Sequence, residues 1–245
     1  MNNPYTFSCN ELLTLYVTSQ REFVSQILIA FSFRYSEEEI RSQVSLVSGE
    51  IVDEINARTE SFARRTENVE FLMSIGLSDF YFGEEAETKI SFEMRRGFNG
   101  EIKTYEDLIQ NIESSTHIDC SISFENEVRH FQIKRYPQEY LKHTNEAFLN
   151  YLDQQIIPHY SNMVGTTLVV ILQPNPSHTP KEFRFEELAE ALHERAETIT
   201  FDEVALAYSD ATGGVENSFL HRLHPYYEIS SIPTDRILRR FRGEI

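Results

Sequence analysis

Cysteine and long hydrophobic runs are both scarce in this sequence. The two cysteines, Cys9 and Cys120, are too few for a disulfide framework and lack the spacing of a metal-binding motif, so we expect buried thiols. The longest apolar run near the N-terminus, residues 27–31, is far shorter than the ~20 residues of a membrane-spanning helix and too short for an export signal. We therefore expect a cytoplasmic protein that has no membrane partner.

Basic residues are also few. The chain has 22 lysines and arginines against 39 acidic residues, giving a formal net charge of -17. This balance argues against a general nucleic-acid binder, which usually presents a basic face. It does not exclude a metal-dependent nuclease, because such a site needs carboxylates. We expect an isolated chain to grip DNA weakly, and to act as a homo-oligomer or beside a larger DNA-engaging subunit.

Several common motifs are missing. The sequence has no internal repeat, no low-complexity linker, no P-loop, no GxGxxG and no GxSxG. These absences give no support to a P-loop, dinucleotide-binding or serine-hydrolase function. The length of 245 residues suits one large domain, or one domain with a helical extension.

Residues 1–80 are predicted to form an N-terminal helical region. Ser8 and Glu11 form a capping box that opens a first helix, and a second box begins at Ser36. Apolar residues recur every three or four positions along the second helix: Ile40, Val44, Val47, Ile51 and Ile55. This region is the expected interface with a partner; alternatively, it only packs on the sheet and completes the fold.

Residues 81–245 are predicted to form an α/β domain. Residues 118–124 and 128–136 are rich in β-forming residues and flank a polar, turn-like segment, which indicates a β-hairpin. The other predicted elements are strands at 89–94, 167–172 and 204–208, and helices at 104–114, 144–160 and 185–197. The resulting order β-α-β-β-α-β-α-β predicts a mixed central sheet covered by helices.

The hairpin gathers three polar side chains. Gln132 and Lys134 are two residues apart, so they point to the same face of their strand, whereas Ile133 points to the other. A turn near residues 125–127 brings Asp119 beside Gln132 and Lys134. We predict a carboxylate, an amide and an ammonium on one face.

These groups suit metal-dependent phosphodiester hydrolysis. Asp119 would bind Mg²⁺ (or Mn²⁺) directly, because hard cations prefer carboxylate oxygen, and the backbone carbonyl of Ile133 could be a further ligand. Lys134 could stabilise negative charge on the phosphate or orient the attacking water. The alternative is that Asp119 and Lys134 are an ordinary cross-strand ion pair on an exposed face.

The segments Ile118–Asp119 and Phe131–Arg135 resemble the D…(D/E/Q)xK signature of the PD-(D/E)xK nuclease superfamily. The glutamine form is similar to Mrr-type restriction endonucleases and to nuclease domains of bacterial antiphage systems. The resemblance, over residues 85–210, implies a restriction-endonuclease-like αβββαβ core and a metal-dependent DNA endonuclease of antiphage defence. One alternative is an inactive nuclease-fold protein that serves as a binding or assembly subunit of a defence complex. Another is an unrelated α/β interaction protein.

Gln132 stands where the superfamily usually has a second acid. An amide is a neutral and weaker ligand, so another carboxylate should help to hold the metal. The resemblance implies that it comes from a helix before the core. Glu54 is the first choice, because it falls at the edge of the apolar stripe of its helix. Glu50 and Glu93 are the alternatives, and each of the three could instead be a solvated surface residue.

Overall fold

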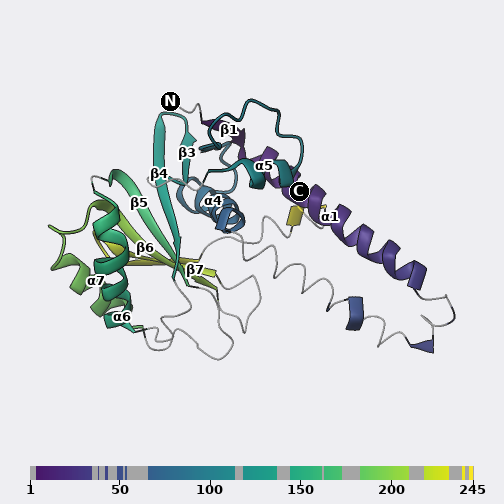
Figure 1. Cartoon of the computed structure of the whole chain (residues 1–245). Helices are drawn as coiled ribbons and strands as arrows, with labels where there is room; N and C mark the ends of the chain where they lie inside the picture. Colours follow the sequence, from purple (N-terminus) through teal and green to yellow (C-terminus); the bar gives the residue numbers. More distant parts are fainter. Residues whose placement is uncertain are drawn as a thin grey trace.

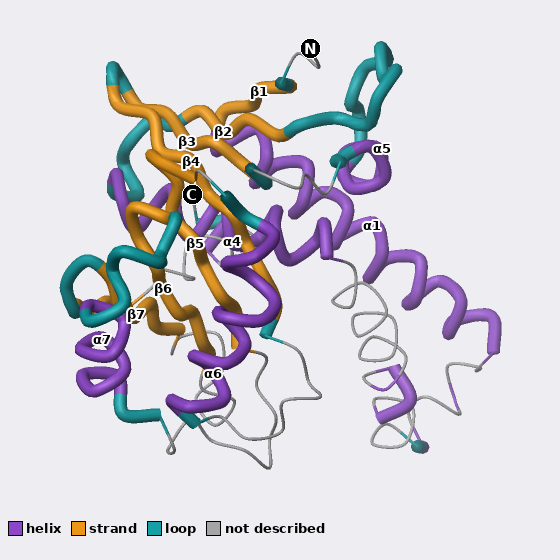
Figure 2. The backbone as a smooth tube through the Cα atoms, turned by 60° about the vertical axis from the view of Figure 1, so that its left-hand side comes forward, coloured by secondary structure: helices purple, strands orange, loops and turns teal. Residues whose placement is uncertain are grey.

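The computed structural model describes residues 4–34, 38, 42–43, 49–51, 53, 66–113, 118–136, 144–161, 163–172, 183–209, 218–231, 239–240 and 243–244. These residues form an eight-stranded mixed sheet with helices on both faces (Figures 1 and 2). The predicted α/β class with a mixed central sheet is therefore confirmed.

The strands lie in the sheet in sequence order. The first four are antiparallel neighbours: β1 (Tyr5–Ser8), β2 (Lys89–Phe92), β3 (Cys120–Phe124) and β4 (Glu127–Arg135). Parallel pairing links β4 to β5 (Met163–Leu172) and β5 to β6 (Phe201–Ser209). Antiparallel pairing then adds β7 (Ser218–His224) and β8 (Glu228–Ser231). The hairpin β3–β4 thus lies in the middle of the sheet, next to its parallel part.

The helices divide between the two faces of the sheet. One face is covered by α1 (Cys9–Arg34), α4 (Thr66–Phe82) and α5 (Tyr105–Asn111). The other face, over β5 to β7, is covered by α7 (Phe185–His193) and by α6 (Asn145–Tyr151), which continues into a π-helical turn at Leu152–Ile156 and a 3-10 turn at Ile157–His159. Alternation along β5 shows the division: Val169 joins the first core, and Leu168 and Val170 join the second.

Every strand and helix predicted between residues 88 and 208 is present in the structure. The predicted capping box is also confirmed, since Glu11 Oε2 accepts a hydrogen bond from the Ser8 amide at 2.6 Å and Ser8 Oγ accepts one from the Glu11 amide at 3.1 Å. The first eighty residues are not wholly helical, however, because β1 pairs with β2 at the edge of the sheet. The second predicted helix lies largely outside the described residues.

The N-terminal helices share a hydrophobic core with the sheet. Leu12 of α1 and Phe71 of α4 are fully buried and belong to the same cluster as Phe131 of β4. This packing means that α1 and α4 hold the face of the hairpin opposite Gln132 in place. None of the described helices is long and apolar enough to cross a membrane.

Candidate functional site

The hairpin β3–β4 sets the register of the site. Its turn is Glu125–Asn126, and the positive φ of 53° at Glu125 lets two residues reverse the chain between Phe124 and Glu127. Cys120 then pairs with Phe131. Asp119 lies directly before β3 rather than within it, and its amide donates to the Phe131 carbonyl at 2.9 Å. That bond holds Asp119 against the start of the ladder.

One oxygen of Asp119 gathers the predicted residues. Oδ2 accepts a hydrogen bond from Nε2 of Gln132 at 2.6 Å and another from the backbone amide of Ile133 at 2.6 Å. Nζ of Lys134 lies 3.9 Å from the same oxygen. Asp119, Gln132 and Lys134 therefore meet as the sequence predicted.

The site is deeply buried at one end and open at the other. The side chains of Asp119 and Gln132 have no exposed surface, whereas Lys134 keeps 23% of its side-chain surface exposed. Within the part of the chain that the structure describes, Oδ1 of Asp119 and Oε1 of Gln132 are buried without a hydrogen-bond partner. Leaving a buried acceptor unsatisfied costs roughly 1–3 kcal/mol, so each of these two oxygens would gain from a hydrogen-bond donor or a cation.

Burial and charge act in opposite directions on Asp119. Desolvation raises its pKa to about 6, although the Lys134 ammonium and the hydrogen bonds from Ile133 and Gln132 lower it. The negative charge of Glu93 raises the pKa further. The Asp119 carboxylate thus carries a negative charge in surroundings that disfavour it. A bound cation would offset that cost.

The residues expected to complete the site are placed differently. Glu54 lies outside the described residues, and Glu50 is exposed in the short described stretch 49–51. Glu93 follows β2 and is exposed, and its charge acts on Asp119. Which of the three carboxylates completes the site stays a prediction. The backbone carbonyl of Ile133 points toward the Asp119 side of β4. A strand residue directs its N–H and C=O toward the same neighbouring strand, and the Ile133 amide donates a hydrogen bond to Asp119.

Sequence reasoning missed Glu70. This residue lies in α4 and is only 1% exposed. The pKa of the buried Cys120 thiol is raised mainly by burial, and the negative charges of Asp119 and Glu70 raise it further. A second buried carboxylate therefore approaches the start of β3 from the helix that precedes β2. The signal available in the sequence was a polar stripe in an otherwise apolar helix, formed by the buried residues Glu70, Ser74 and Ser78.

The donors at the hairpin fit a hard divalent cation. They are a carboxylate oxygen, an amide oxygen and a backbone carbonyl, and Mg²⁺ in proteins is commonly held by one or two carboxylates with water and substrate phosphate completing the shell. Among the described residues, no group of three or more His, Cys, Asp or Glu side chains is gathered to hold a metal.

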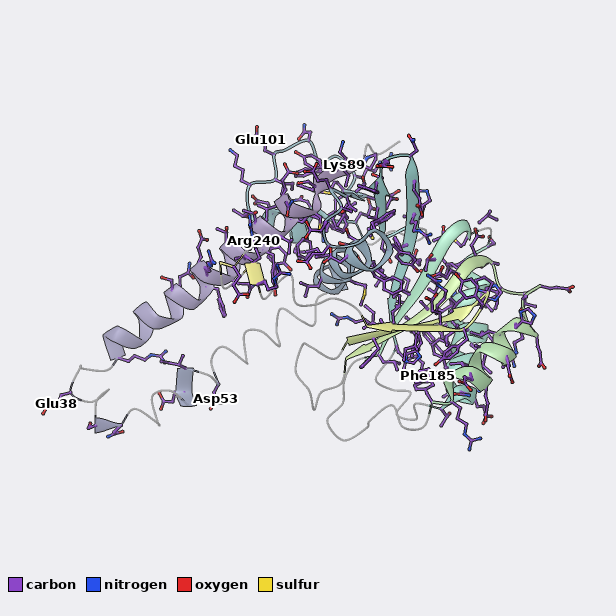
Figure 3. All side chains as sticks on the ribbon, turned by 180° about the vertical axis from the view of Figure 1, so that it is seen from behind. Glu38, Asp53, Lys89, Glu101, Phe185 and Arg240 are labelled. Atoms are coloured by element: carbon purple, nitrogen blue, oxygen red, sulfur yellow. The ribbon has the colours of Figure 1, made fainter. Side chains whose placement is uncertain are left out.

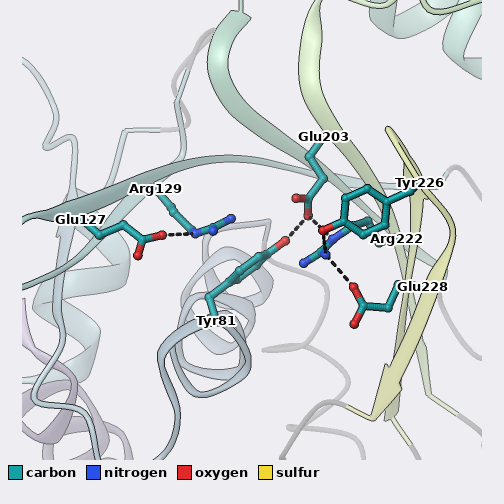
Figure 4. Close-up of polar contacts among 7 residues, drawn as sticks. All are labelled: Tyr81, Glu127, Arg129, Glu203, Arg222, Tyr226 and Glu228. Carbon is teal, nitrogen blue, oxygen red and sulfur yellow. Dashed lines mark hydrogen bonds and ion pairs between the residues drawn. The ribbon is translucent and has the colours of Figure 1, made fainter. Parts of the chain in front are cut away.

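A second polar cluster lies on the opposite face of the sheet (Figure 4). Tyr81, at the end of α4, donates a hydrogen bond to Glu203 of β6, and Arg222 of β7 contacts Glu203 at 3.2 Å and Glu228 at 2.6 Å. Arg129 lies over the Tyr81 ring at 4.4 Å. Burial and the Glu203 charge raise the pKa of Tyr81. These contacts link α4 to β4, β6 and β7.

No protein-family model, no curated protein and no solved structure matches this chain. The residues that point to a function are therefore those of the hairpin, Asp119, Gln132 and Lys134.

Proposed function

We propose that this chain is a metal-dependent DNA endonuclease of the PD-(D/E)xK type, using Mg²⁺ or Mn²⁺. The observation that supports the proposal most strongly is the convergence of Gln132, Ile133 and Lys134 on one oxygen of Asp119, while Oδ1 of Asp119 and Oε1 of Gln132 stay without partners among the described residues. An ordinary cross-strand ion pair on an exposed surface would not be buried in this way.

The order of the elements also supports the proposal. From α4 to β5 the chain runs α4, β2, β3, β4, α6 and β5, with α5 inserted between β2 and β3. The αβββαβ order of restriction-endonuclease-like cores has the same sequence of helices and strands. The candidate residues lie at β3 and β4, the second and third of the three consecutive strands β2, β3 and β4.

Each residue would have a distinct part in hydrolysis. A metal ion bound here would polarise the phosphate and lower the pKa of a bound water. Asp119, Gln132 and the carbonyl of Ile133 would hold that ion, and Glu93, whose charge acts on Asp119, would add negative charge near it. Lys134, which is partly exposed and 3.9 Å from Asp119, would neutralise charge that develops on the phosphate.

A nuclease-fold protein without catalytic activity is the second candidate. The observation that favours it is the lack, within the described ranges, of a third clustered acidic or histidine ligand, combined with a net charge of -17. In that case the hairpin would have a structural role alone, and the chain would serve as an assembly or binding subunit of a larger complex, in antiphage defence as the resemblance implies. Either candidate is expected to work as a homo-oligomer or with a partner subunit.

Cleavage of plasmid DNA separates the two candidates. The wild-type chain should convert supercoiled plasmid to nicked or linear DNA with Mg²⁺ or Mn²⁺, and EDTA should stop the reaction. Asp119→Ala and Lys134→Ala should each lower the cleavage rate by at least about a hundredfold. The first removes a metal ligand, and the second removes a group that stabilises charge on the phosphate. Asp202→Ala and Lys103→Ala change exposed residues elsewhere and should cleave normally. Activity that survives in both site variants would refute the proposal.

A further inference from the structure

The first four strands leave one face of the sheet accessible. Burial alternates along β1, β2 and β3, so that Phe7, Ile90 and Ile122 are buried against the helices while the residues between them are not. The accessible residues, which we call the open face, are Thr6, Ser8, Lys89, Ser91, Ser121, Ser123, Val128 and His130. The described helices α6 and α7 lie over the later strands and not over this face (Figures 1 and 2).

The open face is continuous with the candidate site. Asp119 and Ser121 are two residues apart on one side of the hairpin, and His130 and Gln132 are two residues apart on the other, so all four belong to the same face. Four residues separate Asp119 from Ser123, which corresponds to roughly 13 Å along an extended strand. A polymer bound at Asp119 would therefore extend over this face.

Hydroxyl groups dominate the open face and retain hydrogen-bond donors. Oγ1 of Thr6 and Oγ of Ser91 are 2.8 Å apart, and only one of the two protons can lie between them. Oγ of Ser121 lies 2.7 Å from Nδ1 of His130, and either histidine tautomer leaves one donor, an O–H or an N–H, for another group. Serine and threonine hydroxyls are common donors to backbone phosphates.

The charged residues of the open face, and its lack of aromatic residues, indicate which kind of nucleic acid it could bind. Lys89 is exposed on β2. The positive charges of Lys89 and Lys134 equal the negative charges of Glu93 and Asp119, so this region is close to neutral although the whole chain has a net charge of -17. The open face has no Phe, Tyr or Trp among its residues, so it offers no platform of the kind on which unpaired bases stack. We infer that the open face of β1–β4 binds the sugar–phosphate backbone of double-stranded DNA and guides it to Asp119, an inference that rests on the proposed function.

Binding of a short fluorescent duplex, measured by anisotropy with Ca²⁺ in place of Mg²⁺, tests the inference. Lys89→Glu should weaken duplex binding roughly tenfold and reduce the salt slope by about one, because one phosphate contact is lost and a repulsive charge replaces it. Lys103→Glu makes the same charge change at a lysine whose side chain is 75% exposed near α5, and it should bind nearly as wild type does. Figure 3 shows Lys89 on the part of the sheet remote from Phe185, so the substitution leaves the α7 side of the molecule untouched. Ser123→Glu should behave like Lys89→Glu.

The outcomes separate this inference from the proposed function. A wild-type chain that cleaves DNA, with Lys89→Glu and Lys103→Glu equally effective in binding, would overturn the inference and leave the nuclease proposal standing. Duplex binding that depends on Lys89 without any metal-dependent cleavage would support the inference and refute the nuclease. Tighter binding of a single strand than of the duplex would overturn the inference. A Lys89→Glu variant that changes the mass measured by light scattering while leaving DNA affinity unchanged would also overturn it, because the open face would then be a protein contact.

Discussion

Gln132 and Asp119 are thirteen residues apart in the sequence and are joined by a buried hydrogen bond of 2.6 Å from Nε2 to Oδ2. The bond fixes the orientation of the amide, because its nitrogen faces the carboxylate and its oxygen is turned away. That oxygen and Oδ1 of Asp119 are both buried and, among the described residues, without a hydrogen-bond partner. Gln132 therefore adds a buried neutral oxygen to the site and no second negative charge.

Gln132→Glu should exchange stability for metal affinity. A second carboxylate beside Asp119 brings two like charges together in a desolvated site, so the metal-free variant should be less stable at pH 8 by about 1–3 kcal/mol. A cation would relieve that repulsion, and Mg²⁺ affinity should rise by about tenfold because the number of charged ligands increases. Thermal unfolding with and without Mg²⁺ measures both effects. Gln132→Met, which removes the amide oxygen, should lower the affinity instead; equal responses in the two variants would contradict the orientation described above.

Asp119→Asn should stabilise the metal-free protein at neutral and alkaline pH. Burial raises the pKa of Asp119 to about 6 in the folded chain, above its unfolded value of 3.8, so the folded state binds the extra proton between these values. Stability from this group is complete below pH ~4 and is lost as the pH rises through 6. At pH 8 the variant should exceed the wild type by up to about 3 kcal/mol, and the gap should close toward pH 4. Urea unfolding across pH 4–8 measures the gap, and a constant difference would contradict the raised pKa.

His221 should give the opposite slope. It is only 2% exposed and stacks on Phe185 at a centroid distance of 3.6 Å, and burial lowers its pKa to about 4 from 6.5. The folded state therefore resists protonation, so stability is present above pH 6.5 and is lost as the pH falls through 4. His221→Phe should keep the packing and flatten this acid slope by up to about 3 kcal/mol. A variant that loses stability between pH 6.5 and 4 as steeply as the wild type would show that His221 is not the group responsible.

Arg222→Met should destabilise the fold. The side chains of Arg222 and Glu203 are 11% and 12% exposed, and removing the guanidinium leaves a mostly buried carboxylate without its charge partner. We expect a loss of roughly 3 kcal/mol, near the lower end for broken buried pairs. Arg195→Met breaks an exposed pair with Asp153, whose side chains are 42% and 44% exposed, and should cost under about 1 kcal/mol. If both variants lost less than about 1 kcal/mol, the cluster of Tyr81, Glu203 and Arg222 would contribute little to the stability of the fold.

Local patterns in the sequence were enough to predict the hairpin and its polar group. Strand alternation and a short polar turn determine that Asp119 meets Gln132 and Lys134, because a register slip of one residue would turn every side chain to the other face. The same alternation predicted the strands that follow. The catalytic role of these residues is not determined by that pattern and stays a prediction.

Contacts between distant parts of the chain could not be predicted in the same way. Glu70 is buried because α4 docks on the sheet, and the polar stripe within residues 66–82 does not by itself say that this side of the helix faces the start of β3. The edge strand β1 pairs with β2 more than eighty residues later, so its four residues gave no periodic signal of their own. Glu54 belongs to a predicted helical stripe that lies largely outside the described residues, whereas a negative charge that acts on Asp119 comes from Glu93.

Whether Asp119 is a metal ligand can be measured by Mn²⁺ binding, followed by the electron paramagnetic resonance signal of free Mn²⁺ during a titration. The wild-type chain should bind one Mn²⁺ per site tightly at pH 8, and binding should weaken below pH 6 as protons compete for Asp119. Asp119→Ala should abolish this binding, whereas Asp202→Ala, which removes an exposed carboxylate from β6, should retain it. Equal Mn²⁺ binding by the wild type and by Asp119→Ala would contradict the account.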